Sequence, residues 1–218
     1  MIEDPYIKYL ASQYLNPAFV DSVGNGAIFG CLVACAVMNP NKFWLNDVDD
    51  SKKLKHREIY RIAPILKRNI IYSLGIVSAE EIREIKNIFK AEKIAMKKAI
   101  KGLPVKPDAV FVDGKYTLPE YNSYAIIRGD SRNFGIACAS IIAKDYRDHF
   151  MMENYPGIYE WYDIKKNFGY KSPKHFIAIR KYGLTDNHRF WFPQIKRVLS
   201  GDYDPIIHQK YQHHWEKV

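Results

Sequence analysis

Short apolar segments alternate with helical patterns along most of this chain, and that order leaves few folds open. The first two apolar segments, residues 18–21 and 27–38, are separated by Gly24 and Gly26, which permit the positive φ angles of a tight turn. Apolar runs on both sides of such a turn are typical of paired strands. The sequence therefore predicts a β-hairpin in this region.

Two helical patterns then flank a third strand. The first begins near Ser51, an N-cap residue type, and contains Pro64, which predicts a kink or a break. The strand is the run NIIYSLGIVS. The second helix starts with a capping box, in which Glu81 follows Ser78 at the required spacing, and Gly102 closes it.

Two more strands each lead to an acidic residue. The run AVFVDG contains Asp113, and the run YAIIRGD ends at Asp130. A helix with small residues on one face follows at residues 134–152. Alternating strands and helices of this length predict an α/β fold, with a mixed sheet that contains parallel strands.

The remainder of the chain has a different composition. Residues 155–218 are rich in Tyr, His, Lys and Trp, and they include a helical pattern at Pro173–Tyr182. We expect a main domain at residues 1–154 and a C-terminal helical cap and tail at residues 155–218, packed on the same domain. The final run HQKYQHHWEKV is expected to be mobile at its end.

The charge of the chain points to an anionic partner. Its 33 Lys and Arg exceed its 24 Asp and Glu, which gives a formal charge of +9 and is typical of proteins that bind nucleic acid or a membrane surface. The longest apolar run, residues 27–38, is far shorter than the roughly 20 residues of a membrane span. The chain also lacks a secretory start, so we expect a cytoplasmic protein with no membrane partner.

Cysteine usage agrees with an intracellular location. Cys31, Cys35 and Cys138 are an odd number and form no CxxC pair. This pattern argues against a disulfide framework and predicts buried free thiols.

Three aspartates, Asp21, Asp113 and Asp130, stand at the ends of predicted strands. Functional groups gather at strand ends in open α/β sheets, so these three acids can converge on one point. Clustered carboxylates repel each other unless cations neutralise them. Hard oxygen ligands suit Mg²⁺ or Mn²⁺, and a pair of such ions can promote phosphodiester cleavage. The alternative is that these acids are ordinary turn and cap residues.

Five segments, in order along the chain, resemble motifs of the ribonuclease HII family. They are DDSKKLKHRE, VFVDG, IIRGDSRNFGIACASIIAKDYRD, FGYKSPKH and YGLTDNHRFWF, and the similarity covers residues 19–199. The resemblance implies a ribonuclease H-like fold, which has a five-stranded mixed sheet flanked by helices and a C-terminal helical extension. It also implies metal-dependent endonucleolytic hydrolysis of RNA in RNA/DNA hybrids, including a single ribonucleotide embedded in DNA.

The resemblance assigns roles to residues of this chain. Asp21, Asp113 and Asp130 match metal ligands that hold two divalent ions, Mg²⁺ or Mn²⁺. Tyr170 matches a tyrosine that stacks on the sugar beside the ribonucleotide, a contact that tolerates any sequence. The glycine amides of the hairpin turn match those that sense the 2′-hydroxyl. The candidate substrate contacts are Ser22, Gly24, Asn25, Gly26, Lys52, Lys144, Tyr170 and Arg189.

These assignments have plain structural alternatives. Any one of the basic residues is also consistent with a solvated surface charge, although a set of them suits a phosphate backbone. His175 and His188 match motif positions, and we expect hydrogen-bonded core residues there rather than metal ligands.

The first acidic motif departs from the family. The sequence DSVGNG stands where the family has DExGRG, so Ser22 replaces a metal-binding Glu and Asn25 replaces an Arg. A hydroxyl is a poor ligand for a hard cation at neutral pH, and the loss of a ligand is expected to raise the barrier by ~3–5 kcal/mol. Asp145 and the acids at positions 47, 49 and 50 are candidates for a substitute, with solvated surface acids as the alternative.

The sequence leaves more than one function open. The favoured one is a monomeric type 2 ribonuclease H that acts on RNA/DNA hybrids or on DNA containing ribonucleotides. The alternative is a catalytically impaired homologue that binds hybrid or RNA without cleaving it. A basic scaffold protein is a third possibility.

Overall fold

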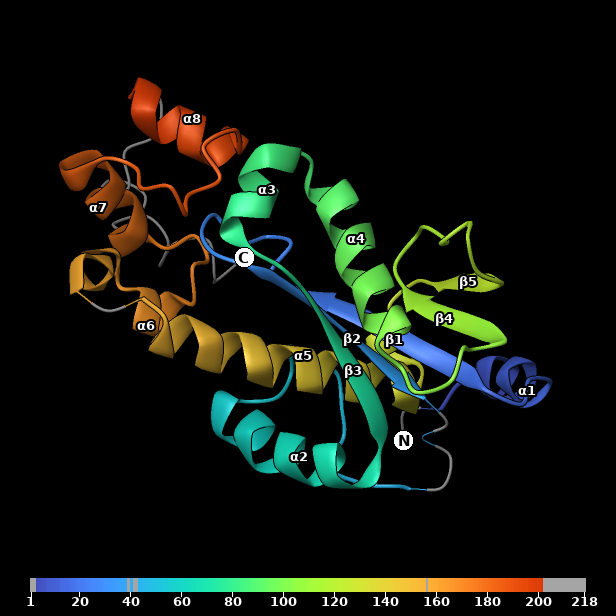
Figure 1. Cartoon of the computed structure of the whole chain (residues 1–218). Helices are drawn as coiled ribbons and strands as arrows, with labels where there is room; N and C mark the ends of the chain where they lie inside the picture. Colours follow the sequence, from blue (N-terminus) through green and yellow to red (C-terminus); the bar gives the residue numbers. More distant parts are fainter. Residues whose placement is uncertain (1–2, 39, 41–42, 156, 202–218) are drawn as a thin grey trace, which may run out of the picture. The chain divides into compact units, whose positions relative to one another are not determined.

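The computed structural model describes residues 3–38, 40, 43–155 and 157–201 (Figure 1). These residues form two compact units: the first draws on the described parts of 3–25, 32–77 and 89–147, and the second on those of 26–31, 78–88 and 148–201. The helices are α1 Pro5–Ser12, α2 His56–Asn69, α3 Ala79–Ile85, α4 Ile88–Lys101, α5 Phe134–Glu153, α6 Ile164–Asn167, α7 Pro173–Tyr182 and α8 Pro193–Ser200. The strands are β1 Pro17–Val23, β2 Leu32–Met38, β3 Ile71–Val77, β4 Ala109–Asp113 and β5 Ser123–Ile126.

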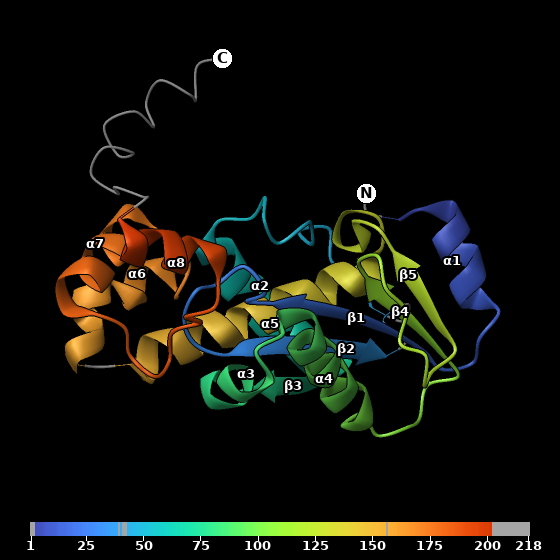
Figure 2. The same ribbon diagram turned by 90° about the horizontal axis from the view of Figure 1, so that it is seen from above.

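The first unit is built on one five-stranded mixed sheet in the order β3-β2-β1-β4-β5. β1 runs antiparallel to β2, as predicted, and β2 runs antiparallel to β3. β2 begins only at Leu32, however, so residues 27–31, which were predicted to be strand, belong to the connection between β1 and β2. β1 and β4 are parallel, as are β4 and β5. The α/β class and the mixed sheet are therefore as predicted. In Figures 1 and 2, α4 covers one face of this sheet, and α2 and the first part of α5 cover the other.

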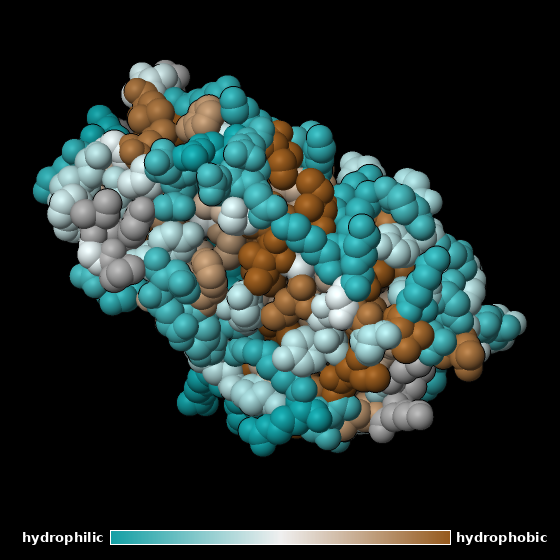
Figure 3. Space-filling model, viewed as in Figure 1, coloured by the Kyte–Doolittle hydropathy of each residue, from teal (hydrophilic) through white to brown (hydrophobic). Residues whose placement is uncertain are grey.

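The core of the first unit lies on both faces of the sheet. Every residue of β2 is buried, as expected for a central strand covered on both sides. Phe19 of β1 stacks on Phe111 of β4 with ring centroids 5.3 Å apart. On the face shown in Figure 3, apolar side chains also gather near α4 and β3, among mainly hydrophilic surroundings.

A glycine sets how closely α4 approaches the sheet. A Cβ at Gly75 in β3 would lie 1.9 Å from the backbone oxygen of Ala95 and 2.5 Å from the backbone nitrogen of Ala99. Only a residue without a side chain fits this contact. The backbone of α4 therefore rests directly on β3.

The second unit is organised around a buried arginine. Arg189 is 1% exposed, and its guanidinium donates hydrogen bonds to the carbonyl oxygens of Ala27 at 2.7 Å and Gly30 at 3.1 Å. Its backbone N–H also donates to Ile28. Arg189 is thus a structural residue that ties segment 26–31 to this unit, in place of the predicted phosphate contact.

Three predicted boundaries differ from the structure. α2 starts at His56 rather than near Ser51, which is buried and whose hydroxyl lies 2.8 Å from that of Ser140. Pro64 lies inside α2, and the helix continues through it. The single helix predicted from Ser78 to Gly102 is two helices, because Lys86 adopts a left-handed conformation (φ 50°) that ends α3.

The helix predicted at Pro173–Tyr182 is confirmed as α7, and all three cysteines are buried and free, as predicted. None of the described helices combines the length and apolar character needed to cross a membrane. The run HQKYQHHWEKV, predicted to be mobile, lies outside the described residues.

Candidate metal centre and substrate site

Asp21, Asp113 and Asp130 come together in the first unit. Asp21 lies in β1, Asp113 is the last residue of β4, and Asp130 lies in a short 3-10 turn at Gly129–Ser131. One carboxylate oxygen from each lies within 4.8 Å of the other two. The predicted convergence of these three acids is therefore present.

The sequence builds this convergence through strand pairing and a close backbone approach. β1 and β4 are parallel neighbours, so Asp21 and Asp113 arrive at the same region of the sheet. The backbone N–H of Gly129 donates a 2.6 Å hydrogen bond to Asp113 Oδ1. A Cβ at Gly129 would lie 2.6 Å from the end of the Ile136 side chain, so a larger residue there would require this side chain to move.

The three carboxylates are short of positive charge. Asp21 is only 5% exposed, and burial, followed by the charge of Asp113, raises its pKa to about 8. Burial, followed by the charge of Asp130, also raises the pKa of Asp113. Carboxylates whose charged form is disfavoured by burial and by like charge are stabilised by a bound cation. Buried oxygen ligands without matching cations suit a hard divalent ion.

Lys52 is the cation that faces this cluster. Its Nζ forms an ion pair with Asp130, while most of its side chain stays exposed. Burial alone would lower the pKa of Lys52, but the contact with Asp130 and the field of Asp21 raise it overall. One ammonium group beside three carboxylates leaves net negative charge at the site.

Ser22 and Asn25 meet an acid that the sequence did not single out. The hydroxyl of Ser22 donates to Glu92 Oε1 at 2.6 Å, and Asn25 Nδ2 donates to the same oxygen and, at 3.0 Å, to Ser22 Oγ. Glu92 is half-buried and lies in α4, 70 positions from Ser22 along the chain. The motif in which the acid is missing therefore contacts a carboxylate from another element.

The substitutes suggested from the sequence are paired elsewhere. Asp145 forms a 2.6 Å ion pair with Lys67, and Asp49 forms one of 3.2 Å with Lys53. Asp47 pairs with Arg61 at 2.9 Å. The metal-ligand group in the described part of the chain includes none of these acids.

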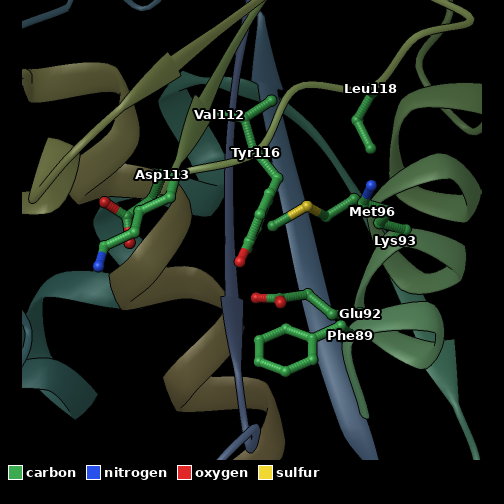
Figure 4. Close-up of a pocket in the computed structure, with 10 residues that line it drawn as sticks. Phe89, Glu92, Lys93, Met96, Val112, Asp113, Tyr116 and Leu118 are labelled. Carbon is green, nitrogen blue, oxygen red and sulfur yellow. The ribbon is translucent and has the colours of Figure 1, made fainter. Parts of the chain in front are cut away.

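A cavity of about 350 Å³ opens beside Asp113 and contains Glu92 in its wall. Figure 4 shows Phe89, Glu92 and Met96 reaching from α4 toward Tyr116. The rings of Phe89 and Tyr116 pack edge to face at 6.1 Å, and both side chains are 60% exposed. Further lining residues are Lys93, Val112, Gly114, Lys115 and Leu118.

Of the two turn glycines expected to permit a positive φ, only Gly24 adopts one. Gly24 has a φ of 105°, which suits glycine, and a Cβ at Gly26 would have no atom within 4 Å. Gly26 is exposed. Lys144, another predicted substrate contact, is half-buried in α5.

Tyr170 belongs to the second unit, where a chain of hydrogen bonds fixes its backbone. The N–H of Thr185 donates to His188 Nδ1 at 3.0 Å, so the other ring nitrogen of His188 carries the proton in the neutral form. That nitrogen lies 3.1 Å from His175 Nε2, and His175 Nδ1 lies 3.0 Å from the carbonyl oxygen of Tyr170. Both histidines are buried, as predicted.

Glu92 and the aromatic cavity are the features that sequence reasoning missed. Glu92 stands among lysines in a helix, where an acid is typical of a solvated surface. Its contact with Ser22 depends on α4 packing over β1, which no local pattern encodes. The one available signal was that Ser22 places a hydrogen-bond donor where the family has an acid, next to the amide donor of Asn25.

Comparison with known proteins identifies the family. The family model for ribonuclease HII matches residues 18–199. The ribonuclease HII of Macrococcus caseolyticus is 37% identical over 84% of this chain and 69% of its own length. That of Chlamydia caviae is 42% identical over 84% of this chain and 86% of its own length.

Solved structures show the same fold. The ribonuclease H2 of Pyrococcus horikoshii superposes with a TM-score of 0.69 at 22% identity, over 86% of this chain and 98% of that one. Bst-RNase HIII in complex with Mn²⁺ superposes with a TM-score of 0.65 at 19% identity, over 85% of this chain and 70% of that one. At these identities, the likeness establishes the ribonuclease H-like architecture.

Proposed function

Because this chain belongs to the ribonuclease HII family, we propose that it cleaves RNA in RNA/DNA hybrids at the Asp21–Asp113–Asp130 cluster. The observation that carries the proposal is the approach of these three carboxylates to within 4.8 Å. The proposed substrate includes DNA that contains a single ribonucleotide. The proposed ions are Mg²⁺ or Mn²⁺, and the protein is proposed to act as a monomer in the cytoplasm.

The three carboxylates perform the binding step. Their oxygens are hard ligands, and the raised pKa values of Asp21 and Asp113 reflect burial and like charge that a divalent ion would offset. When bound, such ions supply an activated water and stabilise the leaving oxygen of a phosphodiester. Lys52 holds Asp130 and places a positive charge next to the cluster, where a phosphate of the substrate would lie.

The other predicted contacts position the substrate. The amides of Gly24 and Gly26 are proposed to contact the 2′-hydroxyl, a group that distinguishes RNA from DNA. Tyr170 is proposed to stack on the sugar next to the cleavage site, and Lys144 to contact a phosphate. The open space around Gly26 supports this role, because a nucleic-acid backbone can approach it closely.

The test is a cleavage assay with a duplex that carries one ribonucleotide, in Mg²⁺ and in Mn²⁺. Asp113→Asn removes one charge from the cluster and is expected to reduce the cleavage rate by about a thousandfold or more. Glu120→Gln removes an exposed carboxylate of the same unit and is the matched control, expected to cleave at the wild-type rate.

Absence of cleavage by the wild type at high concentration in both metals would rule out the nuclease proposal. Ser22 is the observation that keeps a binding function as the second candidate, because its hydroxyl carries no charge. That candidate predicts salt-dependent binding of the hybrid without turnover, measured by fluorescence anisotropy in the same samples.

A further inference from the structure

We propose that the cavity between α4 and the segment after β4 binds one unstacked nucleobase, from a single-stranded extension of the duplex that this protein binds. The cavity lies within the first unit. This inference rests on the proposed binding of nucleic acid. It assigns a role to Phe89 and Tyr116, which lie outside the matched motifs.

The first step is the size and the inner lining of the cavity. Its volume of about 350 Å³ lies within the range of small-ligand sites, roughly 300–1,000 Å³. The buried residues that line it are apolar: Met96, Val112 and Leu118. The cavity therefore has room for a flat ring system and offers it apolar contact.

The second step is the pair of aromatic side chains. Phe89 belongs to α4 and Tyr116 to the segment after β4, and both line the cavity although each is 60% exposed. Their rings are 6.1 Å apart and meet edge to face, as Figure 4 shows. Nucleobases stack on exposed aromatic rings of this kind, whatever the sequence, because every base has a π face.

The third step is the charge around the aromatic pair. Lys93 lines the cavity, and its Nζ lies 5.7 Å from the ring centre of Tyr116. Lys115, which is exposed, is a second cation in the lining. A nucleotide combines a flat base with an anionic phosphate, so it matches both the apolar interior and these two ammonium groups.

The fourth step is the orientation of the ligand. Glu92 lines the cavity, and its carboxylate is held by hydrogen bonds from Ser22 and Asn25. A carboxylate repels phosphate but accepts hydrogen bonds from the amino groups of bases. The base is therefore expected to face Glu92, with its phosphate near Lys93 and Lys115.

The fifth step is the source of the base. Bases within a duplex are paired and stacked, whereas those of single strands are free to splay out onto protein surfaces. Asp113 lines the cavity and also belongs to the carboxylate cluster, so the cavity begins at the residue where the proposed cleavage site ends. Nucleic acid bound at the cluster thus brings its own unpaired nucleotides close to the cavity, which a free nucleotide would have to reach by its own affinity.

The experiment measures hybrid binding in EDTA, so it does not depend on turnover. Fluorescence anisotropy compares RNA/DNA hybrids that carry a short extension of deoxyadenosines, placed on each strand end in turn, with the same hybrids in which the extension is abasic. Both extensions carry the same phosphates, so the difference in affinity reports the bases. The wild type is expected to bind at least one hybrid with bases about tenfold more tightly than its abasic counterpart.

Variants assign this preference to the cavity. Tyr116→Ala and Phe89→Ala are each expected to reduce it to about twofold or less, whereas Tyr116→Phe keeps the ring and is expected to retain most of it. Tyr9→Ala removes an aromatic ring that is 64% exposed on α1, in the same unit, and is the matched control. Thermal unfolding checks that each variant is folded.

Equal affinity of the wild type for extensions with and without bases would overturn the proposal. A preference that survives in both alanine variants would also overturn it, because the base would then bind elsewhere. Adenosine monophosphate that competes as tightly as the extension binds would overturn the assignment to a strand.

The cleavage assay is independent of these outcomes. A preference that depends on Tyr116, in a protein that cleaves no hybrid, would uphold this inference while refuting the nuclease function. Cleavage by a protein that shows no preference for bases in the extension would do the reverse.

Discussion

Ser22 replaces a charged side chain of the family motif with a neutral one, which changes the negative charge carried by β1. Its hydroxyl removes a charge from β1, but the same hydroxyl donates to Glu92, so a carboxylate remains at that end of the strand. Burial, followed by the charge of Asp113, raises the pKa of Asp21 to about 8, so the charge of this carboxylate is poorly compensated in the protein. The local charge therefore still favours a divalent ion.

Two buried histidines of the second unit give a prediction for the pH dependence of stability. Burial lowers the pKa of His175 to about 4 and that of His188 to about 3, the latter with help from the charge of His175. In the unfolded chain, histidine takes up a proton near pH 6.5. This pair therefore contributes full stability above about pH 6.5, and the contribution falls as the pH drops toward the folded pKa values, by about 1.4 kcal/mol per unit for each histidine.

Urea unfolding between pH 7.5 and pH 5 measures this slope. His188→Gln retains hydrogen-bonding groups but removes one titrating ring, so its slope is expected to be smaller by about 1.4 kcal/mol per pH unit. An unchanged slope would show that the histidines are not the source. Since His175 also holds the carbonyl of Tyr170, hybrid affinity is expected to fall over the same pH range.

At the scale of elements, the close contact between β3 and α4 leaves no room for a side chain at Gly75. Gly75→Ala would place a Cβ 1.9 Å from the oxygen of Ala95, so α4 must shift away from the sheet. We expect a loss of about 2–3 kcal/mol in the free energy of unfolding. Gly26→Ala, where a Cβ meets no atom within 4 Å, is the control and is expected to unfold like the wild type. Equal stability of both variants would mean that α4 does not rest on β3.

The boundary between α3 and α4 gives a second prediction at this scale. Lys86 adopts a left-handed conformation, which costs about 1 kcal/mol for a residue with a side chain, and its Nζ lies 5.7 Å from the Phe190 ring centre. Lys86→Gly and Lys86→Ala both lose the contact with the Phe190 ring, but only the glycine variant removes the conformational strain of the left-handed backbone. Thermal unfolding is expected to show the glycine variant more stable by about 1 kcal/mol. An alanine variant of equal stability would contradict the assigned conformation.

These elements also show how far the sequence was sufficient. The hairpin, β4 and α7 were predicted because their signals are local: a glycine turn, an apolar run ending at Asp113, and Pro173 following an N-cap serine. The break at Lys86 was not predicted, because nothing in a lysine signals a left-handed residue. The late start of α2 has a tertiary cause, since Ser51 is buried against Ser140 instead of capping a helix.

In the candidate site, too, some residues were predicted from the sequence and others were not. Asp21, Asp113 and Asp130 were predicted because each follows an apolar strand, and parallel pairing of β1 with β4 brings the first two together. Glu92 was missed because its contact with Ser22 arises only when α4 crosses β1. Arg189 was misjudged because a basic residue in a motif suggests phosphate binding, whereas here carbonyl oxygens surround its guanidinium.

At the scale of the whole molecule, we expect the excess of positive charge to contribute to substrate binding. The chain carries a formal +9, yet the candidate metal centre is a local concentration of negative charge. A nucleic-acid backbone that neutralises several lysines and arginines releases counterions, so its affinity falls steeply with salt. We therefore expect the dissociation constant for an RNA/DNA hybrid to rise by about a hundredfold or more between 50 and 200 mM salt.

A comparison of two lysine variants can distinguish a specific phosphate contact from a general effect of the positive net charge. Lys171 is exposed and follows Tyr170, so Lys171→Gln is expected to reduce the slope of log affinity against log salt by about one. Lys106 is also exposed but lies outside the matched motifs, and Lys106→Gln changes the net charge by the same amount. Anisotropy titrations in EDTA, which prevent cleavage, measure both slopes. Equal slopes in the two variants would assign the affinity to net charge alone, whereas a smaller slope in Lys171→Gln would place a phosphate of the hybrid beside Tyr170.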